Sequence, residues 1–423
     1  MKIAIILALI AKIPLVFLII ATLYLLYFAL SVRIKRLKPE FYPFVSVFVY
    51  AKNAGNTIRR KIENLLEQNY PKDKYEIIVY DNGSVDETEK ICTEYAKKGK
   101  IKYLRTAEGK EEKKKNIWII NHKPYDRKAP LLDFAIKNFS KGEILLMNDP
   151  DVVCEKNWIV DMVQPFKDEK VGGVAGTVHC GNYYKSLMTR LRAVEDEWSY
   201  VVTRMVDSSI VALYGANYGL RRKAWEETGH GNSLIEDVDI TLSLVNKGWK
   251  TVGMSASGVE EEVENLKQYW RQRTRWYRAR FWDVLKGKRK IAKIKAFLPY
   301  TIQPLALFSM YAIFISGFMY WNVYDVFFSC LPFVLLHAAM IGGFLKIKTG
   351  RAFIPFIPLY LTLDSVLFAL TFLYVHTLGR FQKDLWPSLE GKYYHSGSRL
   401  KRWFFWFEQK PRKKNKKSKN KGG

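Results

Sequence analysis

Two carboxylates one residue apart follow an apolar stretch in the segment "LLMNDPDVV" at 145–153. Asp149 and Asp151 flank Pro150, and the simplest interpretation is a turn that ends a strand, because Asn, Asp and Pro are common turn residues. The alternative is a metal site, since Mg²⁺ binds one or two protein carboxylates and takes its other ligands from water and substrate phosphates. The other motifs of the chain distinguish these two interpretations.

A second motif, "VYDNGSVDET" at 79–88, also ends an apolar stretch in acidic and amide side chains. Asp81 and Asn82 can hydrogen-bond a base or a ribose, and Gly83 permits a sharp turn. A strand-to-helix turn without any ligand can have the same composition. This motif by itself is therefore weak evidence for a ligand-binding site.

Three acids open a predicted helix in "LIEDVDITL" at 234–242. Acids in the first turn complement the helix dipole, which explains Asp239 well. That explanation suits Glu236 and Asp237 less, because they follow the Gly-rich "GHGNSLI", which can carry them into a cleft. We interpret this pair as candidate site residues.

An Arg- and Trp-rich segment, "YWRQRTRWYRARFW" at 269–282, forms the fourth motif. Gln272, Arg275 and Trp276 are spaced i, i+3, i+4 and share one helix face. Arginine binds phosphate oxygens in bidentate fashion, and a Trp ring offers a flat face for a sugar. The alternative is an amphipathic helix on anionic lipid. The remaining arginines suit that second role: Arg271, Arg273, Arg278 and Arg280.

Short apolar runs alternate with helical patterns through residues 44–290. We expect strands at 44–51, 75–81, 142–149 and 171–178, and helices at 57–68 and about 86–98. This alternation predicts an α/β fold with a mainly parallel sheet covered on both faces. Ligands bind beyond the carboxyl ends of such strands, where Asp81 and Asp149 fall. The charged stretch 107–128 fits no strand or helix and is interpreted as a surface insertion, either a mobile flap or a plain solvated loop.

The chain also carries apolar stretches of membrane-spanning length. Residues 13–30 form an uninterrupted run of 18 apolar residues, followed by the basic "RIKRLK". The run is long for a signal peptide and has a stop-transfer patch, so we interpret it as a transmembrane helix with residue 33 onward in the cytoplasm. Three later stretches lie at about 300–320, 326–345 and 353–377.

These stretches create a conflict over topology. Three crossings would leave the Lys-rich tail outside, against the positive-inside rule, so one stretch is expected to be re-entrant or interfacial. The third is the weakest span because it carries Pro355, Pro358 and Asp364. The predicted organisation is a membrane segment at 1–38, an α/β domain at 44–290, two or three spans at 291–380 and a largely disordered basic tail at 381–423.

The charge balance indicates an acidic partner. Lys and Arg outnumber Asp and Glu by 68 to 41, a formal +27. The Lys-rich end of the tail, "KPRKKNKKSKNKGG" at 410–423, has no aromatic residues for base stacking, and no nucleic-acid motif occurs, so anionic lipid headgroups explain the charge better than nucleic acid. A transporter, with Asp364 as an intramembrane acid, would leave the α/β domain unexplained. The four scattered cysteines indicate neither a disulfide framework nor a zinc site.

The four motifs together resemble those of family 2 glycosyltransferases. The chain is similar over about residues 44–286 to the membrane-bound branch with the D, D-x-D, E-D, Q-x-x-R-W signature, which includes cellulose, chitin and hyaluronan synthases. The resemblance implies a GT-A fold, which is Rossmann-like, and an inverting transfer from a nucleotide-sugar donor, commonly UDP-linked. It also implies Mg²⁺ or Mn²⁺ as the cofactor.

The resemblance assigns roles to the donor-side residues. Asp81 would contact the nucleoside, and Asp149 and Asp151 match D-x-D, with Asp151 as the direct metal ligand. Asn53 belongs to a position where the family has an Asn-Glu pair, here Asn53-Ala54. Lys128 is aligned with a lysine that contacts the diphosphate, although the preceding insertion leaves that alignment open.

The acceptor-side roles follow from the other two motifs. Asp237 matches the family's general base, with Glu236 beside it, and Gln272, Arg275 and Trp276 match Q-x-x-R-W. We therefore expect an integral glycosyltransferase of the cell membrane with a cytoplasmic active site. Q-x-x-R-W favours a growing polysaccharide as the acceptor, slightly over a polyprenyl phosphate or glycolipid precursor. The small number of C-terminal stretches favours the lipid.

Overall fold

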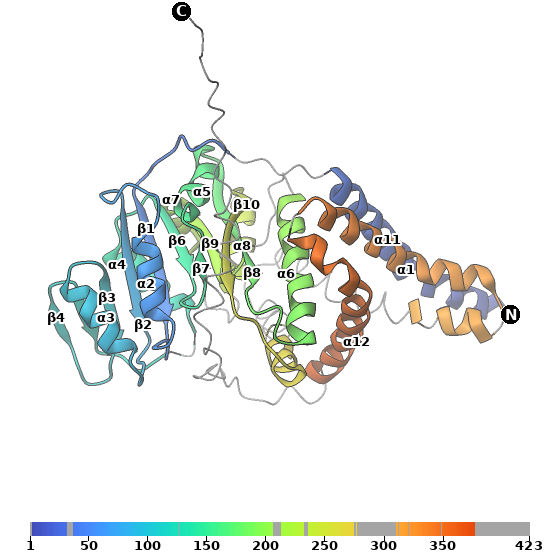
Figure 1. Ribbon diagram of the computed structural model, residues 1–423. Helices are drawn as coiled ribbons and strands as arrows, with labels where there is room; N and C mark the ends of the chain where they lie inside the picture. The colour runs from blue at the N-terminus through green and yellow to red at the C-terminus, as the bar shows by residue number, and fades with distance from the viewer. Residues whose placement is uncertain are drawn as a thin grey trace, which may run out of the picture.

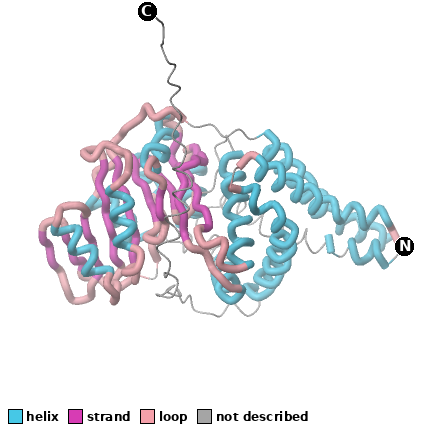
Figure 2. Tube along the Cα trace, viewed as in Figure 1, coloured by secondary structure: helices cyan, strands magenta, loops and turns pink. Residues whose placement is uncertain are grey.

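The computed structural model describes residues 2–31, 37–125, 127–205, 213–231, 236–274, 276, 310–311, 313–319, 321–347 and 349–376. A twisted sheet with helices on both faces forms one half of the protein, and long helices form the other (Figure 1). The strands and the long helices are clearly segregated in Figure 2. Arg275 and the basic tail at 381–423 lie outside the described residues, so the predictions made for them are not addressed by the fold.

The described elements alternate through the first part of the chain and become helical in the second. The strands are β1 (Val45–Ala51), β2 (Tyr75–Asp81), β3 (Lys102–Thr106), β4 (Glu112–Lys114), β5 (Ile117–Ile120), β6 (Ile144–Asn148), β7 (Val153–Cys154), β8 (Val171–Cys180), β9 (Asn217–Arg221) and β10 (Lys250–Glu260). The helices are α1 (Lys2–Ser31), α2 (Ile58–Leu66), α3 (Thr88–Lys97), α4 (Ala129–Phe139), α5 (Trp158–Val163), η1 (Gln164–Lys167), α6 (Leu187–Met205), α7 (Arg222–Thr228), α8 (Glu236–Asn246), α11 (Val323–Leu345), η2 (Gly350–Phe356) and α12 (Ile357–His376).

The sheet has the order β4-β5-β3-β2-β1-β6-β9-β8-β10-β7. β1 lies between β2 and β6 and is parallel to both, so the carboxyl ends of these strands share one edge. The predicted strands and α/β class agree with this arrangement. The sheet is nevertheless mixed, because β9 runs antiparallel between β6 and β8, and β4 and β7 are also antiparallel to their neighbours.

The insertion at 107–128 contains regular structure, contrary to the sequence prediction. β4 and β5 form a hairpin there, and β5 extends the sheet in parallel with β3. The turn between them passes through Asn116, which has a φ of 61° and is one of the few residue types that adopt this conformation readily. The apolar "IWII" of β5 pairs with the sheet, while the lysines that obscured its pattern belong to the exposed edge strand.

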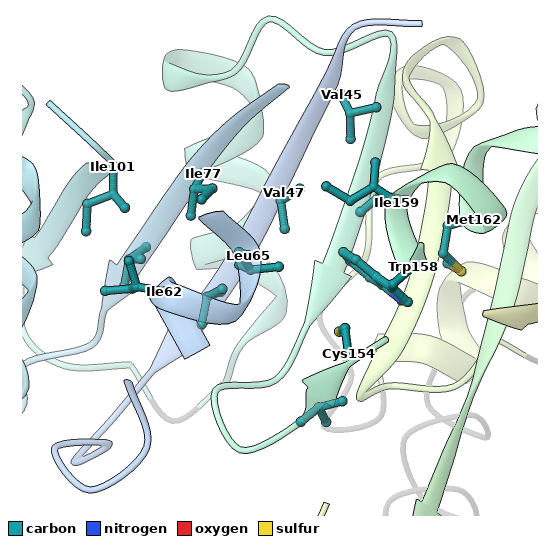
Figure 3. Packing of buried hydrophobic residues seen from close by; sticks show 14 of the residues in the cluster. Val45, Val47, Ile62, Leu65, Ile77, Ile101, Cys154, Trp158, Ile159 and Met162 are labelled. Carbon is teal, nitrogen blue, oxygen red and sulfur yellow. The ribbon is translucent and has the colours of Figure 1, made fainter. Parts of the chain in front are cut away.

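The core has one layer on each face of the sheet. α2 buries Ile58, Ile62 and Leu65 against one face, near Trp158 of α5 (Figure 3). α4 buries Leu131 and Leu132 against the other face, together with α7 and α8. The strands between these layers are buried on both sides, which explains their near-continuous apolar sequences.

The helical half is organised around α6. α1 and α11 pack side by side and run in the same direction. Lys12 pairs with Asp325 at 2.7 Å near the start of α11, and Lys346, just past its end, donates to the carbonyl of Leu30. η2 and α12 pack against both α6 and α11, and α6 joins them to the half that contains the sheet, called the catalytic half below for its candidate site (Figure 1).

Among the described residues, one helix combines the length and the apolar composition needed to cross a membrane. α11 is long and apolar enough to cross a bilayer, whereas α1 contributes only the shorter apolar stretch Leu15–Ser31. Spans at both ends of the chain, and the domain boundaries drawn from them, therefore stay predictions.

Candidate active site

The shared edge of β1, β2 and β6 brings together residues that lie far apart in the sequence. Asn53 follows β1, Asp81 ends β2, and Asp149 follows β6. Their strands are adjacent and parallel, so these side chains belong to one region of the sheet. The structure thus brings these predicted residues together at the carboxyl ends of the strands, and their role as a site stays a prediction.

Lys128 joins the D-P-D turn to the E-D helix. Its Nζ lies 2.7 Å from Asp149 Oδ1 and 3.3 Å from Glu236 Oε1, and it donates to the carbonyl of Gly215 at 3.1 Å. Burial alone would lower the pKa of Lys128, but the two carboxylates outweigh it and raise that pKa above its usual range. Lys128, Asp149 and Glu236 are called the catalytic cluster below.

Asp237 is oriented by backbone amides at the start of α8. Its Oδ2 accepts from the Gly215 N–H at 2.9 Å, and its Oδ1 accepts from the Val238 N–H at 2.9 Å. The same loop accepts from Asp149, whose N–H donates to the Ala216 carbonyl at 3.1 Å. The segment 214–216 therefore links the D-P-D turn, Lys128 and the E-D motif.

Asp81 is fully buried, and protein groups already occupy both of its oxygens. Oδ1 accepts from the backbone and hydroxyl of Ser84, and Oδ2 accepts from Tyr103 at 2.7 Å and Arg105 at 3.0 Å. Ser84 also accepts from the N–H of Asn53, which has a φ of 50°. The carboxylate therefore holds the turn after β2 in shape.

Asn82 links this turn to the segment before Lys128. Its amide accepts from the N–H of Tyr125 at 2.9 Å and donates to the Tyr125 carbonyl at 2.7 Å. The insertion that obscured the sequence alignment is thereby tied to the turn after β2.

The D-P-D turn offers two carboxylates to a metal. Asp149 and Asp151 are both half-buried. No group of three or more His, Cys, Asp or Glu side chains suited to a metal occurs in the described parts of the chain. Mg²⁺ or Mn²⁺, which takes one or two protein carboxylates and shares a substrate diphosphate, fits this all-oxygen donor set.

The Q-x-x-R-W segment lies against α6. Gln272 Oε1 is buried and, within the described part of the chain, has no hydrogen-bond partner. Trp276 has Arg273 at 4.8 Å and Arg192 at 5.8 Å from its ring centroid. These guanidinium groups contact the ring that the sequence analysis assigned to an acceptor sugar. Arg275, which precedes Trp276 in the sequence, is not among the described residues.

Arg273 does not face lipid, contrary to the amphipathic interpretation of this segment. It is buried and pairs with Glu195. Arg192, also buried, binds Glu262 in bidentate fashion at 3.0 and 2.5 Å and pairs with Asp196 at 3.1 Å. These residues, Arg192, Arg273, Glu195, Asp196 and Glu262, are called the interface cluster, because they join α6 to the end of the sheet and to the Q-x-x-R-W segment.

Lys61 is a site-adjacent residue that the sequence analysis missed. It is 1% exposed on α2, and its Nζ contacts Asn148 directly before Asp149. Burial lowers its pKa, while the neighbouring Cys154, Asp151 and Asp149 oppose that effect. The signal was present in the sequence, because Ile58, Lys61, Ile62 and Leu65 share the buried helix face and a lysine there is unusual.

Comparisons with known proteins agree with this geometry. The chain is 31% identical over 261 residues to a probable glycosyltransferase YdaM of Bacillus subtilis, covering 60% of this chain and 59% of that protein. It is 28% identical over 256 residues to a beta-monoglucosyldiacylglycerol synthase of Nostoc sp., covering 57% and 51%. The chain thus matches about half to three-fifths of the length of these relatives.

A solved structure supports the fold. The mannosyltransferase PcManGT from Pyrobaculum calidifontis, in complex with GDP-Man and Mn²⁺, superposes with a TM-score of 0.50 at 17% identity, over 81% of this chain and 99% of that one. The family model described as "Glycosyltransferase like family 2" matches residues 43–279, more than half of the chain and all four motifs up to Trp276. The chain therefore belongs to glycosyltransferase family 2.

Proposed function

We propose that this protein is a membrane-associated, inverting glycosyltransferase that moves a sugar from a nucleotide-diphosphate donor to the hydroxyl or phosphate of a lipid acceptor. The observation that carries the proposal is the catalytic cluster. Lys128 connects an acid of the D-P-D turn with an acid of the E-D helix, at the carboxyl edge of the sheet. Lys128 also donates to the Gly215 carbonyl, and the Gly215 N–H donates to Asp237. A cation, two acids and the candidate base are thus linked by direct contacts and through Gly215.

The chemistry assigned to this chain's residues begins with the acceptor. Asp237, held by the Gly215 and Val238 amides, takes the proton of the acceptor hydroxyl. The acceptor oxygen attacks the anomeric carbon from the face opposite the diphosphate, and the bond between that carbon and the diphosphate breaks. A positioned base of this kind typically contributes about 10²–10⁴-fold to the rate.

The departing diphosphate needs positive charge. Lys128 can supply it, because its Nζ is already held between Asp149 and Glu236 and carries a raised pKa. Gln272 has a buried amide suited to a polar ligand group. When bound to Asp149 and Asp151, Mg²⁺ or Mn²⁺ would supply further charge neutralisation on the diphosphate.

The proposed location is the cytoplasmic face of the cell membrane. Large apolar side chains are exposed along α1 and α11, among them Phe17, Tyr27 and Phe327. Because α1 and α11 run in the same direction, both would enter the cytoplasm at their C-terminal ends, near Ser31 and Lys346. The catalytic half lies at that same end (Figure 2).

This arrangement suggests an answer to the topology conflict. The stretch at 353–377 is assigned an interfacial position, because it contacts α6 as well as α11 and carries Pro355, Pro358 and Asp364. With that stretch not crossing, the basic tail stays in the cytoplasm, where anionic headgroups attract it. The stretch near 300–320 would then be the return crossing, and most of it lies outside the described residues.

A lipid acceptor is favoured by the position of the apolar helices. α6 contacts the catalytic half through β8 and β10 and contacts α1, α11 and α12 on its other side, so the site lies next to the proposed bilayer surface. A relative named beta-monoglucosyldiacylglycerol synthase agrees with this choice. A polysaccharide is the second candidate, favoured by Gln272 and Trp276 at Q-x-x-R-W positions and by a relative named hyaluronan synthase.

The proposal is tested with the full chain in nanodiscs. A panel of UDP- and GDP-linked sugars is supplied with Mn²⁺ or Mg²⁺, and release of the nucleoside diphosphate is followed with diacylglycerol, polyprenyl phosphate or an oligosaccharide primer as acceptor. We expect metal-dependent release with one donor and a lipid acceptor. Asp151→Asn should remove the activity. Asp168→Asn should retain it, because Asp168 is exposed and pairs with Lys250 at the amino ends of β8 and β10.

Two outcomes would contradict the proposal. Transfer to the oligosaccharide alone would replace the lipid by a polysaccharide acceptor. Absence of release with every donor and acceptor would reject the assigned chemistry while leaving the family membership intact.

A further inference from the structure

A lysine is buried beneath the D-P-D turn. Lys61 lies on the face of α2 that packs against the sheet, between Ile58 and Leu65, and only 1% of it is exposed. Figure 3 shows Leu65 of the same helix on the side of Cys154 and Trp158, and Ile62 on the side of Ile77. The Lys61 ammonium lies 5.9 Å from the Trp158 ring centroid. The charge is thus inside the hydrophobic core.

The three polar contacts of Lys61 converge on the turn and its exit. Its Nζ donates to Asn148 Oδ1, to the Val152 carbonyl at 2.8 Å and to Cys154 Sγ at 3.5 Å. Asn148 and Val152 are the residues on either side of Asp149, Pro150 and Asp151. One ammonium group therefore links both ends of the segment that carries the two acids.

These contacts do not suggest a role in stability. All three acceptors are neutral, and a buried ammonium without a hydrogen-bonded carboxylate is costly to desolvate. An apolar side chain of similar length, such as methionine, would fill the same space without that cost. A charged residue at this position is therefore better explained by the hydrogen bonds that Lys61 makes with the D-P-D turn.

We propose that Lys61 is a positioning residue that fixes the D-P-D turn so that Asp149 and Asp151 present their carboxylates to a divalent cation and a nucleoside diphosphate. This inference rests on the proposed function and deepens it. Lys61 itself does not touch the ligand, because its Nζ is below the turn, inside the core.

The turn is held from two directions. Lys61 holds Asn148 Oδ1 from the side of α2, and the Asn148 amide donates to the Ala216 carbonyl at 3.1 Å on the side of β9. With both contacts in place the backbone before Asp149 has little freedom, which pre-organises the ligands. Loss of such supporting hydrogen bonds typically weakens metal binding by about 10–100-fold.

The test measures Mn²⁺ binding directly, by electron paramagnetic resonance on the full chain in detergent with UDP or GDP present. Lys61→Met should raise the Kd for Mn²⁺ by about 10–100-fold. Lys61→Gln should recover part of the lost affinity, because the glutamine amide can donate to the same acceptors.

Lys90→Met is the matched control, since Lys90 is exposed on α3 and pairs with the nearby Glu87. The thermal midpoint of Lys61→Met should stay within about 2–4 °C of wild type.

The reference variant Asp151→Asn separates two kinds of failure. If Asp151→Asn loses Mn²⁺ but Lys61→Met binds it like wild type, the inference about Lys61 is overturned and the proposed metal site stands. If Asp151→Asn and wild type bind equally, the proposed site itself is rejected. Should Lys61→Met not fold, Asn148→Ala replaces it, because it removes the other end of the same hydrogen bond. Wild-type affinity in that variant would likewise overturn the inference.

Discussion

The catalytic cluster and the interface cluster both surround basic side chains with acids, yet they hold their charges differently. In the catalytic cluster one lysine is shared by Asp149 and Glu236, and Asp149 keeps a third of its side-chain surface exposed. In the interface cluster two arginines are buried among Glu195, Asp196 and Glu262, with bidentate geometry at Glu262.

The difference follows from the chemistry of the two cations. A lysine ammonium is a compact point charge whose donors rotate, so it can exchange a carboxylate for a diphosphate. A guanidinium in a bidentate pair is fixed in direction and is costly to separate from its partner once buried. The first cluster is therefore suited to binding and release, and the second to holding α6 against the catalytic half.

The largest expected effect separates activity from stability at the catalytic cluster. Asp237→Asn should lower kcat by about 10²–10⁴-fold, because the amide cannot take the acceptor proton. Its thermal midpoint should stay near that of wild type, since an amide oxygen can still accept from the Gly215 N–H. Asp239→Asn, in the same first helical turn, is the control and should keep its activity. Equal losses in both variants would indicate damage to α8 rather than removal of a base.

The interface cluster should respond in the opposite way. Arg192→Met leaves Glu262 and Asp196 buried without their cation, so the free energy of unfolding should fall by about 3–5 kcal/mol. Denaturant titration of the detergent-solubilised chain measures this. Lys185→Met, which removes a more exposed partner of Glu264, should cost no more than about 1 kcal/mol. A comparable loss of unfolding free energy in the two variants would contradict the role of the interface cluster in holding α6 against the catalytic half.

The sequence could identify the catalytic cluster because its members fall in short motifs at strand and helix ends. Asp81, Asp149 and Glu236 each follow a pattern that predicts where an element starts or stops, and parallel strands then bring such ends together. Lys128 was reached only through family resemblance, since nothing in the charged stretch before it indicated that its Nζ would lie between two acids.

The interface cluster could not be identified in that way. Arg192 pairs with Glu262, which is 70 residues later, and no local pattern relates the two. The hairpin at β4 and β5 was missed for a different reason, because exposed lysines on an edge strand hide the alternation that indicates a strand. Lys61 lies on the buried face of α2, and the spacing of the apolar residues there does not indicate which contacts a charged side chain makes.

The pH dependence of the unfolding free energy should reveal the contribution of Glu195 in the interface cluster. Burial would raise the pKa of Glu195, but Arg192 and Arg273 outweigh it and lower that pKa to about 2. Because the folded-state pKa lies below the ordinary value of 4.5, Glu195 contributes stability above about pH 4.5 and loses it as the pH falls toward 2.

The effect is measured as the difference in unfolding free energy between wild type and Glu195→Gln across pH 2–7. We expect a difference on the order of 1–3 kcal/mol at neutral pH that disappears in acid. A difference independent of pH would mean that Glu195 acts through packing alone.

The smallest expected effect concerns how α12 is attached. Tyr269, in the segment that leads to Gln272, donates to Asp364 of α12 at 2.9 Å. Tyr269→Phe removes this hydrogen bond while keeping the ring under Arg273, which lies 4.6 Å from the ring centroid. The free energy of unfolding should therefore fall by about 1 kcal/mol.

If α12 lies at the interface and guides the Q-x-x-R-W segment, the same variant should raise the KM for the acceptor while leaving the donor KM unchanged. A transporter role for Asp364 predicts no such selectivity, because Asp364 would then act independently of the residues that bind the acceptor. Steady-state kinetics with each substrate varied in turn therefore tests whether the two halves of the molecule are coupled through this one contact.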